Sequence, residues 1–103
     1  MAEPELAQAL KRLADAFRAE LPNRRAIIEH GLRHPADGDA RAAMHRELHK
    51  LAGLAGSFGH HDLSDSAAEA DERLDDLARR QQPIDRGTTA LIEAVLAAVR
   101  RVS

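Results

Sequence analysis

An apolar stripe with helical spacing runs through the middle of this chain. Five apolar side chains recur at steps of four, three, four and three residues, which places them on one face of an α-helix; they are Met44, Leu48, Leu51, Ala55 and Phe58. At about 100° per residue, His49 projects roughly 140° away from the centre of this stripe. The pattern therefore predicts a helix with a buried seam and a histidine on its far face.

Three further segments carry stripes of the same kind. The first has Leu6, Ala9, Leu10, Leu13, Ala14 and Phe17, and the next has Leu63, Ala67, Ala70, Leu74 and Leu77. The last has Ile84, Leu91, Val95, Val99 and Val102, with Ile92 and Leu96 beside them. No segment shows the alternation expected of a strand. Helices of this kind, joined by short loops, bury their stripes most economically in one bundle. We therefore predict an all-α fold: an antiparallel four-helix bundle (up-down-up-down) in a single domain spanning residues 1–103.

Proline, glycine and aspartate residues indicate where the helices begin and end. Pro22 is expected to kink the N-terminal helix or restart it, so that this helix is broken near Pro22. A cluster of glycine, histidine and proline from Gly31 to Pro35 is expected to end it. Asp37 or Asp39 and then Asp85 are candidate N-caps. Gly59 is a plausible C-terminal cap for the helix that holds His49.

Composition excludes several classes of function. Lysine and arginine number 15 against 17 aspartate and glutamate, a balance that argues against a nucleic-acid partner. Phe17 and Phe58 are the only aromatic residues, and both belong to apolar stripes, so no platform remains for stacking bases. The absence of cysteine excludes disulfides and thiolate metal sites. No signal peptide or membrane-spanning run is recognisable, so we expect a cytoplasmic protein without a membrane partner.

The face around His49 has an unusual composition for a helix. Arg46, Gly53, Gly56 and His60 project close to His49. A glycine inside a helix costs about 1 kcal/mol relative to alanine. Two explanations remain open: the glycines leave room for a macromolecule that docks on the imidazole, or they allow close packing between helices.

From the histidine onward the chain reads His49-Lys50-Leu51-Ala52-Gly53-Leu54-Ala55-Gly56-Ser57-Phe58-Gly59. This segment resembles the phosphoacceptor helix of histidine-containing phosphotransfer (HPt) domains, and the helical pattern on either side extends the resemblance over most of the chain. The resemblance implies a four-helix bundle that acts in a multistep phosphorelay. His49 would accept a phosphoryl group from the aspartate of a receiver domain, or from a kinase, and pass it to another receiver aspartate.

The resemblance also implies which partners and groups take part. Receiver domains of response regulators are the expected partners, with a hybrid histidine kinase as a further one. Mg²⁺ is expected on the receiver alone, and no cofactor or metal on this chain, which has a nucleophile but no complete active site of its own. Where the family often has lysine, this chain has Ala52. The phosphoryl-stabilising or docking surface is expected to consist of Arg46, Lys50, Gly53, Gly56, His45 and His60.

Two other functions compete with this interpretation. A non-catalytic helical adaptor that binds a receiver or kinase would have nearly the same sequence, and it would be favoured if the His49 imidazole were buried or hydrogen-bonded through both nitrogens. A small histidine-rich metal-binding protein could use His45, His49 and a loop histidine, His60 or His61. We further expect a monomer, because one bundle could bury every apolar stripe.

Overall fold

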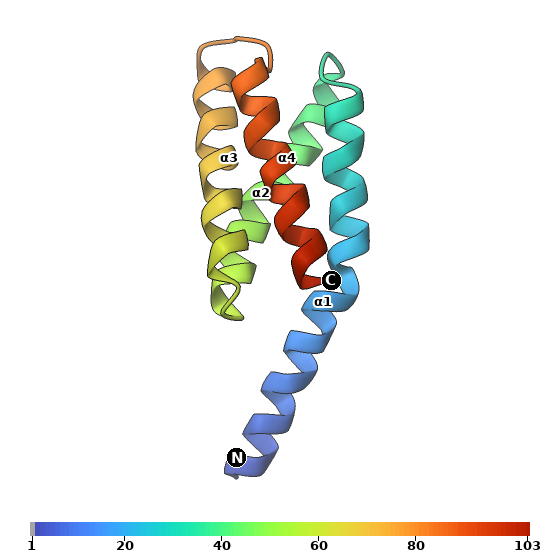
Figure 1. Ribbon diagram of the computed structural model, residues 1–103, viewed down its shortest axis with the longest axis vertical. Coiled ribbons are helices and arrows are strands. Elements are labelled where there is room, and N and C mark those ends of the chain that lie inside the picture. Colours follow the sequence, from blue (N-terminus) through green and yellow to red (C-terminus); the bar gives the residue numbers. More distant parts are fainter. Residues whose placement is uncertain (1) are drawn as a thin grey trace.

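The protein is a bundle of α-helices that run alternately up and down (Figure 1). The computed structural model describes residues 2–103, and within that range the helices are α1 (Glu3–Arg33), α2 (Gly38–Ser57), α3 (His61–Arg79) and α4 (Arg86–Val102). Helix α2 packs against α1 and α3, and α4 packs against α3 and α1. Residues 2–103 contain no strand. The predicted all-α, antiparallel four-helix bundle is therefore confirmed.

The core is built from the apolar stripes of α2, α3 and α4 together with Phe17, Leu21 and Ile28 of α1. All five stripe residues of α3 are buried, as are the first four of α2, whereas Phe58 is half-buried at the bundle end. In α4 the buried positions include Ile92 and Leu96 beside the expected Val95 and Val99. Arg24 of α1 and the buried Glu47 of α2 form an ion pair with an Nη1–Oε1 distance of 2.7 Å, which ties these two helices together next to the core.

The predicted break near Pro22 does not occur, because α1 is one continuous helix with Pro22 inside it. Proline removes one backbone N–H from the helical ladder, which would have bonded to the carbonyl of Arg18. Both residues are exposed, so water can satisfy the freed carbonyl. Burial of Leu21 and Ile28 holds the helix together on the opposite face. Figure 1 shows the ribbon of α1 bending as it enters the bundle, without interruption.

Gly31 does not mark the end of α1; it is a buried residue inside the helix. A Cβ atom at this position would lie 2.5 Å from Cβ of Met44 and 3.1 Å from the carbonyl oxygen of Ala40. Glycine is therefore required here by the close approach of α2. The helix continues to Arg33, and His34 then serves as its C-cap residue.

The N-terminal part of α1 extends beyond the rest of the bundle (Figure 1). Leu6, Leu10 and Leu13 in this part are 48%, 54% and 56% exposed. The premise that one bundle buries every apolar stripe is therefore wrong for these three leucines. No other described helix reaches far enough along α1 to cover them.

The helix ends match the predicted capping residues closely. Asp37 is the N-cap of α2 and accepts hydrogen bonds from the backbone N–H groups of Asp39 and Ala40. Asp85 caps α4 and accepts hydrogen bonds from the hydroxyl and backbone N–H of Thr88, which lower the pKa of the Asp85 carboxyl. After α2, Gly59 adopts a φ of +82°, a left-handed conformation that favours glycine.

Candidate functional site

His49 stands midway along α2 on the face opposite the buried seam. Leu48 and Leu51, its neighbours in the seam, are fully buried, and their packing fixes the rotation of α2 about its axis. This rotation points His49 outward, where 77% of its side chain is exposed. The outward projection predicted from the stripe is therefore correct.

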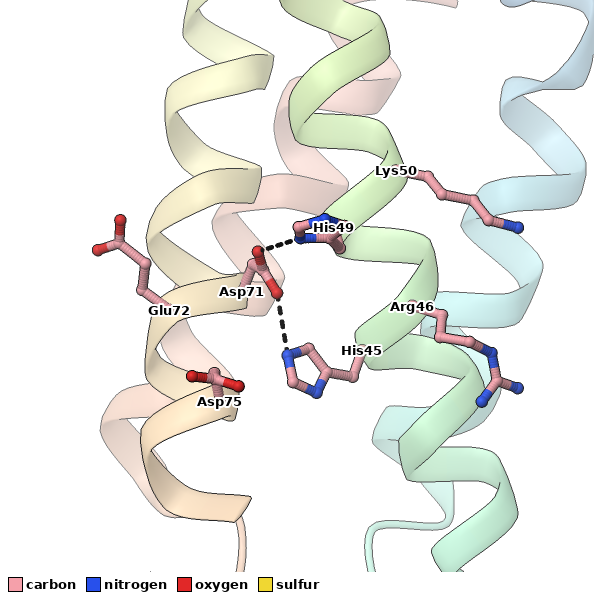
Figure 2. Close-up of a pocket in the computed structure, with 7 residues that line it drawn as sticks. All are labelled: His45, Arg46, His49, Lys50, Asp71, Glu72 and Asp75. Carbon is pink, nitrogen blue, oxygen red and sulfur yellow. Dashed lines mark hydrogen bonds and ion pairs between the residues drawn. The ribbon is translucent and has the colours of Figure 1, made fainter. Parts of the chain in front are cut away.

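Asp71 of α3 binds two histidines of α2 at once (Figure 2). Its Oδ2 lies 2.8 Å from Nδ1 of His49, and its Oδ1 lies 2.9 Å from Nε2 of His45. The two histidines are one helical turn apart, so their rings lie on the same side of α2 and flank the carboxylate. Only 19% of the Asp71 side chain and 27% of the His45 side chain are exposed. Neighbouring side chains therefore restrict the position of the Asp71 carboxylate.

The bond to Asp71 determines which nitrogen of His49 can react. An ionised carboxylate only accepts hydrogen bonds, so Nδ1 of His49 must carry the hydrogen. In the neutral ring, Nε2 then holds the free lone pair. No group within residues 2–103 hydrogen-bonds this Nε2. Nε2 of His49 is therefore a nucleophilic nitrogen exposed to solvent, and the hydrogen bond from Nδ1 to Asp71 fixes the orientation of the ring.

A shallow hollow between α2 and α3 surrounds the two histidines. Its lining residues are His45, Arg46, His49, Lys50, Asp71, Glu72 and Asp75. The carboxylates belong to α3, whereas Arg46 and Lys50 extend from α2 on the side away from Asp71 (Figure 2). His49 consequently lies on a boundary between an acidic flank and a basic flank. A dianionic group on Nε2 would be attracted towards the α2 side.

The two glycines near His49 have different reasons to be glycine. A Cβ atom on Gly53, one turn after His49, would meet nothing within 4 Å, so packing does not require glycine there. A Cβ atom on Gly56 would lie 3.1 Å from Oγ of Ser64, which itself donates a 2.6 Å hydrogen bond to the carbonyl of Ala52. Close helix packing therefore accounts for Gly56, and clearance beside the imidazole remains the explanation for Gly53.

The structure brings together some of the predicted site residues and separates one. His45, Arg46 and Lys50 share the hollow with His49. His60 does not, because it follows the end of α2 and stacks on Phe17 with a ring-centroid distance of 5.6 Å. The end of α2 at Ser57 already lies about 12 Å along the axis from His49, so His60 belongs to a different part of the surface.

Asp71 is the site residue that sequence reasoning missed. The acidic residues of α3 predict an ordinary solvated face, and by charge Asp71 is one of them. It lies, however, four residues after Ala67 and three before Leu74, both in the buried stripe. That spacing places Asp71 at the edge of the seam, which is the signal that could have identified it as a contact with α2.

The geometry of the site can be compared with what the metal-binding and adaptor functions would each require. Within residues 2–103 no group of three or more histidine, cysteine, aspartate or glutamate side chains is arranged to hold a metal ion, which is the arrangement that the metal-binding hypothesis requires. His49 is exposed and hydrogen-bonded through one nitrogen only. The condition set for the adaptor, a buried imidazole or one bonded through both nitrogens, is not met.

Comparison with known protein families shows which family this chain belongs to. The family model described as the Hpt domain matches residues 5–102, nearly the whole chain. The chain belongs to the Hpt domain family. Membership in this family implies histidine phosphotransfer in two-component phosphorelays and interaction with receiver domains and kinases. Searches of curated proteins and of solved structures found no match. No helix within residues 2–103 of this Hpt domain is long and apolar enough to cross a membrane.

Proposed function

We propose that His49 is the phosphoacceptor of this Hpt domain and that it reacts through Nε2. The observation that carries the proposal is the exposed ring with Nδ1 bonded to Asp71 and Nε2 free. Family membership supplies the reaction class. The phosphoryl donor is the aspartyl phosphate of a receiver domain, or a phosphorylated kinase, and the acceptor is the aspartate of a second receiver.

The bonds and charges of the proposed transfer balance without any further reactant from this chain. The lone pair of His49 Nε2 attacks phosphorus, the bond from phosphorus to the aspartyl oxygen breaks, and the donor leaves as a carboxylate. The ring then carries a positive charge, with its Nδ1–H still donated to Asp71. A carboxylate at that position stabilises an imidazolium, as in the catalytic triad of serine proteases. The reverse sequence passes the group to the next aspartate.

Charge around the ring supports the same assignment. Arg46 precedes His49 by one turn, Lys50 follows it directly, and neither forms an ion pair with another residue in the range 2–103. Both are therefore available to a phosphoryl oxygen or to an acidic partner. Ala52, at the position where the family often has lysine, is half-buried against the core, so we assign the cationic role to the α2 residues Arg46 and Lys50. We propose that this chain needs no metal or cofactor of its own and that Mg²⁺ is supplied with the receiver.

Gly53 contributes clearance to the proposed docking surface. In-line transfer requires the two proteins to approach until the reacting atoms are about 3–3.5 Å apart. The open space beside Gly53 lets a partner backbone come close to the imidazole. Gly56 supports the surface indirectly by allowing α3, and with it Asp71, to approach α2.

The test measures transfer of labelled phosphate to His49. A receiver domain phosphorylated with ³²P on its aspartate is mixed with the wild type, His49→Gln and the control His61→Gln, which removes an exposed histidine outside the hollow. We expect label on the wild type and on His61→Gln and none on His49→Gln. Phosphoramidate serves as a second donor that needs no protein docking. Label retained by His49→Gln, or a wild type labelled by neither donor, would contradict the proposal.

A further inference from the structure

His45 occupies a position that the proposed phosphotransfer does not yet explain. It lies one turn before His49 on α2, and its Nε2 is 2.9 Å from the Asp71 oxygen that His49 does not use. It is the less exposed of the two histidines, at 27% of its side chain against 77%. His45 is therefore placed to act on Asp71 and, through Asp71, on His49.

We infer that His45 is a positioning residue that fixes the Asp71 carboxylate and thereby the ring orientation and tautomer of His49. A carboxylate with one partner can rotate about its last side-chain bond and exchange its oxygens. With Oδ1 held by His45 and Oδ2 held by His49, both oxygens are occupied and the rotation stops. The oxygen that faces His49 is then always in position to accept from Nδ1.

The two contacts to Asp71 favour hydrogens on different nitrogens of the two rings. Because the ionised carboxylate cannot donate, the hydrogen bond to Asp71 places the hydrogen of His49 on Nδ1. The 2.9 Å approach of His45 Nε2 to the same carboxylate favours a hydrogen on that nitrogen. One carboxylate thus selects opposite tautomers in two histidines four residues apart. This pairing is a spectroscopic signature that solvated histidines on a helix face would not show.

No other contact in the hollow replaces the one from His45. Glu72 and Asp75 line the same hollow from α3, but neither forms an ion pair with His45 or His49. Arg46 and Lys50 extend on the far side of α2 (Figure 2). Loss of His45 would therefore leave Asp71 with the single bond to His49.

The first experiment reads the tautomers directly in the unphosphorylated protein. Long-range ¹H–¹⁵N correlation spectra, recorded above the usual histidine titration range, distinguish protonated from unprotonated ring nitrogens. In the wild type we expect hydrogen on Nδ1 of His49 and on Nε2 of His45. His45→Leu is expected to convert His49 to a mixture of tautomers. His45→Gln, whose amide N–H can still donate to Asp71, is expected to restore the Nδ1–H form.

The second experiment measures phosphotransfer, and its interpretation rests on the proposed role of His49. We expect His45→Leu to slow transfer about three- to tenfold, the range set by loss of one hydrogen bond, and His45→Gln to recover most of the rate. His61→Leu is the matched control, because it removes an exposed histidine that lies outside the hollow. In this variant the tautomers of His45 and His49 and the transfer rate should stay at wild-type values.

The two readouts separate failure of this inference from failure of the proposed function. If His45→Leu keeps both the wild-type tautomer of His49 and a transfer rate within twofold, the positioning role is wrong even though His49 reacts. If the wild type transfers nothing, the proposed function is wrong, and the tautomer measurement still decides whether His45 fixes the ring. Equal loss of rate in His45→Leu and His45→Gln would also overturn the inference.

Discussion

Helix α1 has two parts that carry the same apolar spacing in different surroundings. From Phe17 to Arg33 it packs on α2 and α4, and Leu21 and Ile28 are fully buried. From Glu3 to Ala16 it extends alone for about 20 Å, with Leu10 and Leu13 more than half exposed. The comparison shows that a stripe determines which face of a helix is apolar, whereas the length of the neighbouring helices determines whether that face is covered.

The largest expected difference in stability is between truncation of a buried side chain in the packed part of α1 and truncation of an exposed one in the extended part. Ile28→Ala removes a fully buried side chain and should lower the free energy of unfolding by about 2–5 kcal/mol. Leu10→Ala removes a mostly exposed one and should change it by less than about 0.5 kcal/mol. Urea unfolding followed by circular dichroism measures both, with equal m-values required for a valid comparison. A loss above 1.5 kcal/mol for Leu10→Ala would mean that the extended part is covered in solution.

Gly31 tests how closely the covered part of α1 is packed. Gly31→Ala should lower the free energy of unfolding by about 1–3 kcal/mol, because the new Cβ atom would overlap Cβ of Met44, which cannot swing aside. The same substitution favours an isolated helix, so a destabilisation reports packing alone. In a double-mutant cycle with Met44→Gly, which removes the overlapping Cβ atom, Gly31→Ala should cost less than it does beside Met44. A stabilised single variant would contradict the contact.

Gly53 extends the comparison to an uncovered position in α2. Gly53→Ala meets no atom within 4 Å and should raise the free energy of unfolding by about 0.5–1 kcal/mol through helix propensity. Under the proposed function the added methyl group stands beside His49 and should slow transfer from a receiver domain. Labelling by phosphoramidate should be unchanged, because it requires no docking. A variant that is both more stable and fully active would show that clearance at Gly53 is unnecessary.

The smallest expected effect concerns self-association. The uncovered stripe of α1 consists of three leucines, and a helix face about 20 Å long falls well short of the roughly 1,000 Å² that a stable interface buries. We therefore predict a monomer by sedimentation equilibrium, even though one bundle does not bury every stripe. The triple variant Leu6→Gln/Leu10→Gln/Leu13→Gln should sediment identically. A concentration-dependent dimer that this variant abolishes would contradict the prediction.

The sequence predicts features that depend on neighbours within one helix. The seam of α2, the outward direction of His49 and the capping by Asp37 and Asp85 follow from spacing and local hydrogen bonding, and all are present in the structure. Continuity through Pro22 could not be predicted in this way, because burial of the opposite face outweighs the loss of one hydrogen bond.

Features that depend on a second helix are less predictable. Gly31 signals a helix end by composition, yet its glycine is required by Met44 of α2. Asp71 reads as one acidic residue among several until α3 is placed beside α2, and only then does it meet His45 and His49. The candidate site therefore depends on the pairing of α2 with α3, and the residue spacing within either helix alone does not predict it.

The contact from Asp71 to Nδ1 has a consequence for the energetics of relaying a phosphoryl group. The carboxylate touches the ring on the side away from Nε2, so under the proposed function the same hydrogen bond can persist before the group arrives, while it is carried and after it leaves. In the proposed role, neither receipt nor release requires this contact to rearrange, so the protein adds no conformational step to either exchange. Such a carrier imposes no direction by itself. The flow follows the relative amounts and phosphoryl-transfer potentials of the two partners, and it reverses when their balance changes.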